Sequence, residues 1–241
     1  MKKSSGSVHR QATLARILSL GLIVGVAFAS AGCSHKPAAE AGSWPAASKN
    51  ECLPAVKLVD QHGKIIDLTS LKGKPVLVDF IYTSCKSICP VLTAKFRFVA
   101  KLLGPQLGPD VTMLSFTIDP EHDNPPTLLN YAKSEGAKFP GWHFLWGPPP
   151  TLYKVLDLYN IHPVHQPDGS IGHVAMGFLL GPNGYQVRQY DLLEASPKTI
   201  AGDVASEIRQ ARSHSREIGW NEIRKSQISL SRVGQGENNK G

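Results

Sequence analysis

Residues 76–92, which read VLVDFIYTSCKSICPVL, decide the fold of this chain. The run 76–81 is mostly apolar and rich in β-branched residues, which is typical of a buried strand. It leads into two cysteines, Cys85 and Cys89, and Pro90 then opens a helical pattern. Because proline favours the first turn of a helix and disfavours helical geometry in the residue before it, we expect Cys89 at or beside the N-cap and Cys85 in the preceding loop.

Both thiols are then expected near the positive end of a helix dipole. That position lowers a thiol's pKa and favours the thiolate, which is the form that attacks disulfides and binds metals. Residues four apart in a regular helix have Cβ atoms about 5–6 Å apart, whereas a disulfide needs about 3.5–4.5 Å, so a bond between Cys85 and Cys89 requires loop geometry. A shared metal ion tolerates the wider spacing. A static disulfide or two inert core thiols is the alternative reading of this pair.

The first 32 residues are typical of an export signal. Four basic residues precede an uncharged, mostly apolar run from Ile17 to Ala29, which is short for a membrane span. The run ends in Ala-Gly-Cys33, which resembles a bacterial lipobox, and we expect Cys33 to be lipidated as the mature N-terminus. Cleavage after the small-x-small site 27–29 and an uncleaved anchor are the alternatives. Each places the folded domain outside the cytoplasm, in the periplasm or an equivalent space.

Charge argues against a nucleic-acid partner. Residues 1–32 carry four Lys or Arg and no Asp or Glu, so without them the net charge of +7 falls to +3. A nucleic-acid binder would have basic residues clustered among aromatics, and the sequence has no such patch.

Strand and helix patterns alternate along the rest of the chain. A turn at 60–63 predicts a hairpin between 55–59 and 64–68, and a helix from Pro90 carries an apolar face that ends at Gly104. Further strands are expected at 111–118, 142–146, 173–180 and 185–191, and further helices at 125–135, at 151–159 and from Pro197. This order predicts an α/β fold of thioredoxin-like layout, with a mixed central sheet flanked by helices and an N-terminal hairpin.

The chain divides into four segments by composition: a signal peptide at 1–32, a flexible tether at 33–50, a globular domain at 51–212, and a polar tail at 213–241 that we expect to be disordered. Cys52 falls at the start of the domain, and we interpret it as a small buried or partly exposed thiol.

Three segments together resemble the Sco/SenC family of copper-binding, thioredoxin-like proteins. They are residues 82–90 (YTSCKSICP), residues 117–125 (TIDPEHDNP), and His173 ahead of residues 181–184 (GPNG). The family pattern is Tyr-Thr-x-Cys-x-x-x-Cys-Pro, an Asp-Pro-Glu loop and a distal histidine, in that order. Gly181 and Asn124 depart from it, because aspartate and threonine are common at those places.

The resemblance implies one copper ion bound by Cys85, Cys89 and His173. It also implies delivery of copper to the binuclear CuA centre of cytochrome c oxidase, or maintenance of its cysteines, with other copper chaperones or thiol reductases as further partners. The donor chemistry agrees, because two soft thiolates select Cu(I) and an imidazole suits both Cu(I) and Cu(II).

Other candidate donors receive different interpretations. Asp119 could orient a ligand or interact with the metal pocket, or it could be a turn residue. We assign His162 and His165 to a solvated loop. Met176 is expected on the opposite strand face from His173, in the core.

Two functions follow from the same dithiol. The first is a membrane-tethered copper chaperone. The second is a thiol-disulfide oxidoreductase, or a peroxide-reducing protein, that uses Cys85 and Cys89 without a metal.

Overall fold

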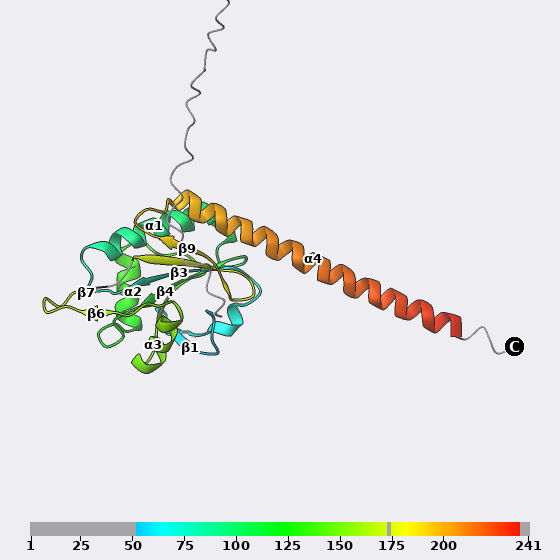
Figure 1. Ribbon diagram of the computed structural model, residues 1–241, viewed down its shortest axis with the longest axis horizontal. Coiled ribbons are helices and arrows are strands. Elements are labelled where there is room, and N and C mark those ends of the chain that lie inside the picture. The colour runs from blue at the N-terminus through cyan, green and yellow to red at the C-terminus, as the bar shows by residue number, and fades with distance from the viewer. Residues whose placement is uncertain (1–51, 173–174, 237–241) are drawn as a thin grey trace, which may run out of the picture. The chain divides into compact units, whose positions relative to one another are not determined.

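The computed structural model of the protein describes residues 52–172 and 175–236, and the side chains of those up to residue 216. Its centre is a seven-stranded mixed sheet in the order β2-β1-β5-β4-β3-β8-β9 (Figure 1). Strands β3, β4 and β5 are parallel, and the other pairings are antiparallel. The strands are β1 (Lys57–Asp60), β2 (Ile65–Asp67), β3 (Val76–Ile81), β4 (Thr112–Thr117), β5 (Trp142–Trp146), β8 (Met176–Leu180) and β9 (Gln186–Asp191). The predicted α/β class and mixed sheet are confirmed.

Strand β3 occupies the middle of the sheet, between β4 and β8. All six of its residues are buried, because helices cover both faces of the sheet at this point. A strand buried on both faces has no need of polar alternation, which is why its sequence is nearly continuously apolar. The predicted central strand is confirmed with its predicted bounds.

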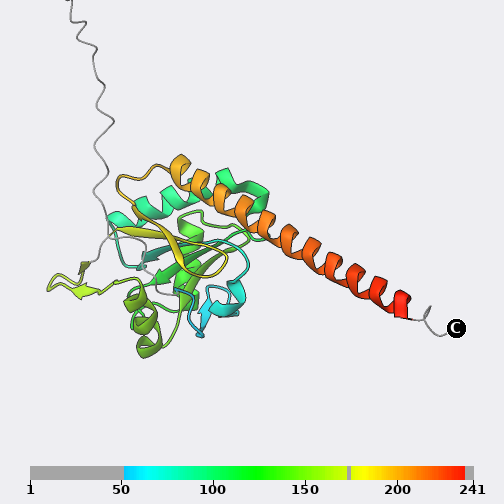
Figure 2. The ribbon, with the colours of Figure 1, turned by 45° about the vertical axis from the view of Figure 1, so that its right-hand side comes forward.

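The helices form two layers. They are α1 (Ile88–Leu103), α2 (Pro125–Ser134), α3 (Pro149–Leu158) and α4 (Pro197–Gly236), with short 3-10 turns η1 (Leu68–Leu71) and η2 (Gly104–Gln106). Helix α1 contacts α2 through a hydrogen bond of 2.8 Å between Thr93 Oγ1 and Tyr131 Oη, and α4 packs along α1. Tyr159, just after α3, instead packs edge-on against Phe80 on the other face of β3. Figures 1 and 2 show α1 and α4 side by side, with α3 across the sheet from them.

Helix α1 follows its predicted apolar pattern. Leu92, Phe96, Val99 and Leu103 are all buried, and the helix ends at Gly104, whose φ of 53° is a conformation that favours glycine. Helix α2 begins as predicted, with the side chain of Asn124 accepting a hydrogen bond from the Thr127 backbone N–H.

Two predictions about the second half of the chain were wrong. Helix α4 continues to Gly236, although we expected disorder from residue 213. A polar segment without an apolar face can still be helical, and this one contains no proline after Pro197. In addition, the Asp168-Gly169 turn belongs to a separate small hairpin of β6 (Val164–His165) and β7 (Ile171–Gly172), and β8 begins only at Met176.

The first described residue is attached at one end of β3. The backbone N–H of Cys52 donates to the Gly184 carbonyl at 3.0 Å, and Tyr159 Oη donates to the Cys52 carbonyl at 2.8 Å. Gly184 lies in the turn after β8, whose Leu180 is in register with Val76 at the start of β3. The cysteines follow the opposite end of that strand.

The predicted signal peptide, the tether and Cys33 lie outside the described residues. Within the described part of the chain, none of the helices has both the length and the apolar character that crossing a membrane requires.

Candidate metal centre

The two cysteines lie where β3 passes into α1. Residues 82–87, the cysteine loop, join the strand to a helix that begins at Ile88, with Ser87 at the N-cap position. Cys89, which we expected at or beside the N-cap, is the second residue of the helix, and the helix begins two residues before Pro90, about half a turn earlier than predicted. Pro90 is tolerated as the third helical residue because the first four N–H groups of a helix have no partner within it. Cys85 lies in the loop, as predicted.

Cys85 is the more acidic of the two thiols. Its side chain is only 5% exposed, and its sulfur accepts a hydrogen bond of 3.3 Å from the Cys89 backbone N–H. Burial alone would raise the pKa of Cys85, but hydrogen bonds from Cys89, the Ser87 backbone and the Tyr82 side chain lower it to about 7. A large fraction of Cys85 is therefore thiolate at neutral pH.

Cys89 has the opposite character. Its side chain is fully buried, and burial raises its pKa well above the ordinary value, with the neighbouring charges of Cys85 and Asp79 adding to that effect. Cys85 and Cys89 are both present as thiols. The pair thus combines one group that ionises readily with one that holds its proton.

A buried carboxylate lies beneath the dithiol, and sequence reasoning missed it. Asp79 sits in the middle of β3, fully buried, and Oδ1 accepts a hydrogen bond of 2.5 Å from Ser115 Oγ. Ser115 in turn accepts one of 2.9 Å from Trp142 Nε1. Oδ2 of Asp79 is buried without a hydrogen-bond partner among the described residues. Burial raises the pKa of Asp79 to about 7, against the lowering effect of Ser115.

A second missed carboxylate holds the cysteine loop to the Asp-Pro-Glu loop. Asp123 is buried, and it accepts hydrogen bonds from the Thr83 backbone N–H at 3.3 Å and from the hydroxyls of Thr83 and Thr117. Burial raises its pKa despite these bonds. Thr83 lies two residues before Cys85, so Asp123 fixes the start of the segment that carries the acidic thiol.

Asp119 contacts an imidazole that the sequence did not single out. Its Oδ1 lies 2.7 Å from Nδ1 of His122, whose side chain is 76% exposed. This contact raises the pKa of His122. A role for Asp119 beside a bound metal stays a prediction.

The other residues named from the sequence lie in different environments, some buried and some exposed. His173 lies outside the described residues. Met176 is buried in the core, as predicted, and His165 is exposed. His162 is exposed as well and pairs with Asp157 at 3.3 Å. Cys52 is fully buried.

The donor set of the described residues is soft and incomplete. Among side chains up to residue 216, leaving out 173 and 174, there is no group of three or more His, Cys, Asp or Glu placed to hold a metal ion. The site provides two adjacent thiols at the buried junction of β3 and α1, and one of them, Cys85, ionises near neutral pH. Two thiolates suit a soft ion such as Cu(I), and a two-sulfur site leaves room for a further donor.

The family of the chain follows from comparison with known proteins. A model of the SCO1/SenC family matches residues 46–209, which span the whole sheet, the dithiol and the start of α4. The chain belongs to this family.

Known members of the family cover most of the described domain. The SCO1 protein homolog of Bacillus subtilis is 34% identical over 155 residues, which are 63% of this chain and 78% of that protein. The structure of Bradyrhizobium japonicum ScoI with copper bound matches with a TM-score of 0.55 and 32% identity, over 63% of this chain and 96% of that one. BsSco, whose structure is described as identifying a disulfide switch in a member of the Sco family of cytochrome c oxidase assembly proteins, matches with a TM-score of 0.55 and 31% identity, over 66% of this chain and 92% of that one.

These matches confirm the thioredoxin-like fold of this SCO1/SenC protein. The dithiol lies between the central strand β3 and the first turn of α1, so the cysteine motif on which the resemblance rests joins the sheet to its first helix.

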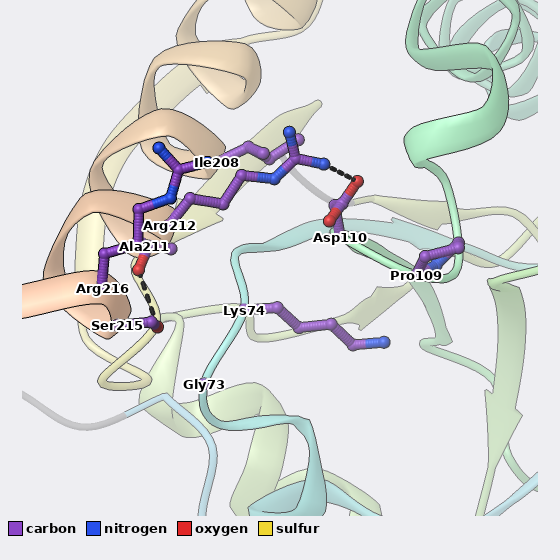
Figure 3. A pocket seen from close by; sticks show the side chains of 9 residues that line it. All are labelled: Gly73, Lys74, Pro109, Asp110, Ile208, Ala211, Arg212, Ser215 and Arg216. Atoms are coloured by element: carbon purple, nitrogen blue, oxygen red, sulfur yellow. Dashed lines mark hydrogen bonds and ion pairs between the residues drawn. The ribbon is translucent and has the colours of Figure 1, made fainter. Parts of the chain in front are cut away.

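A pocket of about 370 Å³ lies at the other end of the sheet. Figure 3 shows Arg212 of α4 pointing to Asp110, with which it forms an ion pair of 2.6 Å. Lys74 Nζ donates a hydrogen bond of 2.6 Å to the Gly108 carbonyl. Because these cations already have partners, and because the pocket lies before β3 and β4 rather than after them, we do not include it in the metal centre.

Proposed function

We propose that this SCO1/SenC protein is a copper chaperone, which binds one copper ion through Cys85, Cys89 and His173. It delivers the ion to the CuA site of cytochrome c oxidase or maintains the thiols of that site. The observation that carries the proposal is the pair of unlike thiols at the β3–α1 junction, with the pKa of Cys85 lowered to about 7. Copper bound to ScoI of Bradyrhizobium japonicum, a protein of the same family and fold, supports it.

The residues around position 173 support a ligand near the dithiol. The Ile171 backbone N–H donates to Tyr82 Oη at 3.3 Å, and Tyr82 is the first residue of the cysteine loop. Met176, three residues after position 173, begins a strand whose register brings Gly177 opposite Asp79 of β3. The chain on both sides of His173 thus lies at the carboxyl end of β3.

The two thiols take different parts in binding. Cys85 can offer a thiolate at neutral pH without help from a base, whereas Cys89 has to release its proton when a metal binds. The bound copper ion would be redox-active, and a partner could take over the ion by ligand exchange. Oxidation of both thiols to a disulfide removes two of the three donors, so copper binding requires a reduced site.

The location and the partners are part of the same proposal. The signal-like first 32 residues and Cys33 support an exported domain held to the membrane by a lipid and facing the periplasm. In that compartment, reductases or other copper chaperones would keep the dithiol reduced or load it.

Copper titration tests the chaperone function. Reduced, metal-free protein should bind one equivalent of Cu(II) and develop thiolate-to-copper charge-transfer absorption. Replacement His173→Ala should weaken binding and change the spectrum, whereas the control His162→Ala should change neither. Unaltered binding and an unaltered spectrum in His173→Ala would contradict the three-ligand assignment.

The same unlike thiols favour a second function. A thiol with a pKa of about 7 beside a buried thiol of raised pKa is suited to attack a disulfide and then to resolve the mixed disulfide. We therefore carry thiol-disulfide exchange, or reduction of peroxide, as the alternative. Turnover with a thiol donor that survives a copper chelator and disappears in Cys85→Ser would favour it. Absence of turnover would count against it.

A further inference from the structure

Helix α1 carries a second apolar surface on the side that faces solvent. Val91, Phe98 and Leu102 are 56%, 55% and 54% exposed, although the opposite side of the same helix fills the core. Steps of seven and four residues place them along one line of an α-helix. We call these three residues the outer stripe. A single exposed apolar residue is ordinary on a protein surface, but three in one line form a continuous apolar surface, which indicates a binding site.

The outer stripe lies in the middle of a helical layer. Helix α2 flanks α1 on one side through Thr93 and Tyr131, and α4 packs along it on the other. Lys95, on the same side as the stripe, donates hydrogen bonds to the carbonyls of Leu192 and Leu193. Leu193, itself 57% exposed, extends the apolar surface beyond the helix.

Basic residues predominate around the outer stripe, although the exposed Glu194 follows Leu193. Helix α1 contains Lys95, Arg97 and Lys101 and has no acidic residue, and Lys86 precedes it in the cysteine loop. The Lys95 and Arg97 groups hydrogen bond to backbone carbonyls, which do not cancel their charge. Lys101 Nζ lies 5.6 Å from the centre of the Phe98 ring. A complementary surface would therefore be apolar at its centre and acidic at its margin.

The outer stripe begins at the end of α1 that carries the dithiol, although the Cys89 side chain itself points to the core on the other side of the helix. Val91 is two residues after Cys89, and at 1.5 Å per residue the stripe extends ~17 Å along the helix to Leu102. A typical protein–protein interface covers about 800 Å² on each partner, which corresponds to a patch roughly 30 Å across. A patch of that width, centred on α1, is wide enough to extend from the cysteine loop to Leu102.

We propose that the outer stripe of α1 is the docking face for the protein that exchanges copper or thiol electrons with Cys85, and that this partner presents an apolar ridge bordered by carboxylates. The proposal rests on the proposed function and adds the partner's chemistry to it. Apolar contact along α1 holds the partner while the lysines steer it, so the dithiol meets the acceptor in one orientation. A protein is favoured over a lipid surface because the contact has to end at the thiols.

Paired substitutions on matched surfaces test the docking face. The probe is the reduced, soluble CuA-bearing domain of cytochrome c oxidase from the same organism. The double variant Phe98→Ser, Leu102→Ser should bind it roughly 10- to 30-fold more weakly, as expected for loss of a central apolar contact. The control variant Ile65→Ser, Tyr185→Ser removes exposed apolar residues (64% and 41%) on the edge strand β2 and in the turn between β8 and β9, and its affinity should stay within about twofold of wild type.

A charge variant provides an independent readout. Lys101→Glu should slow association and reduce its dependence on salt, because steering by charge acts on the association rate. All variants should load copper as wild type does, since none of the replaced side chains is a proposed ligand.

The outcomes separate the two proposals. If wild type transfers no copper to the probe and does not bind it, the chaperone function and the docking face both fall. If wild type transfers copper and the Phe98/Leu102 double variant does so at an equal rate, only the docking face is overturned. It is also overturned if the double variant abolishes self-association of the protein, or its binding to phosphatidylglycerol vesicles, and leaves binding of the probe unchanged.

Discussion

The buried carboxyl group of Asp79 makes stability depend on pH in a direction that can be measured. Its pKa rises from the ordinary 3.8 to about 7, and one pKa unit is about 1.36 kcal/mol, so ionisation of this group in the folded state costs ~4 kcal/mol. The folded protein binds the proton more tightly than the unfolded chain does. Stability contributed by the protonated group is therefore complete below pH 3.8 and is lost as pH rises through the interval up to about 7.

Replacement Asp79→Asn removes this ionisation. The amide has nearly the same shape and can still accept from Ser115, but it cannot lose a proton at these pH values. The free energy of unfolding of the variant, relative to wild type, should therefore increase by ~3 kcal/mol between pH 4.5 and pH 7.5. Any constant cost of burying the amide cancels in this comparison.

Urea unfolding followed by circular dichroism measures the effect. Reduced, metal-free wild type, Asp79→Asn and the control Asp157→Asn are compared at both pH values. Asp157 is 62% exposed, so its variant should follow wild type at each pH. If the difference in unfolding free energy between Asp79→Asn and wild type is the same at pH 4.5 and 7.5, the pKa of Asp79 is not raised by burial as the structure indicates.

Three further predictions concern the site and its support. Iodoacetamide should modify Cys85 of the reduced protein with a midpoint near pH 7, because its pKa is lowered to about 7; peptide mapping that gives a midpoint near 8.5 would contradict this. Gly141→Ala should lower the free energy of unfolding by ~3 kcal/mol, because φ is 84° and the new Cβ would strike the backbone of Gly108, whereas Gly63→Ala, with φ of 78° and open space, should cost only ~1 kcal/mol in the same urea assay. Asp123→Ala should lower stability by ~2–4 kcal/mol, because two threonine hydroxyls and one N–H lose their buried acceptor; an unchanged melting temperature would refute its role in holding the cysteine loop.

The parts of the fold that the sequence predicted well are those where a local pattern and the tertiary environment agree. Residues 76–81 are apolar because β3 is buried on both faces, and the apolar spacing of α1 matches its buried side. The position of the helix start was less certain, because proline is accepted anywhere in the first turn and not only at its first residue. Pro90 therefore could not decide between Ser87 and Cys89 as the cap.

The parts that were missed depend on contacts between distant segments. Asp79 looks like an ordinary acid in sequence, and only the pairing of β3 with β4 brings Ser115 beside it. Asp123 was quoted as part of a loop motif, but its bonds to Thr83 cross forty positions of the chain. The length of α4 was missed for another reason. The prediction of disorder rested on the lack of an apolar face, whereas helix formation also depends on the helix propensity of the residues.

The hydrogen bond from Cys52 to Gly184 decides where force enters the domain. A pull applied at Cys52 acts on the turn between β8 and β9, at the amino end of β3, and, through the Tyr159 hydroxyl, on the residue that follows α3. The cysteine loop lies at the carboxyl end of that strand, ~20 Å away for six residues of extended chain. A pull applied at Cys52 would therefore act about one strand length from the dithiol and not on the cysteine loop itself.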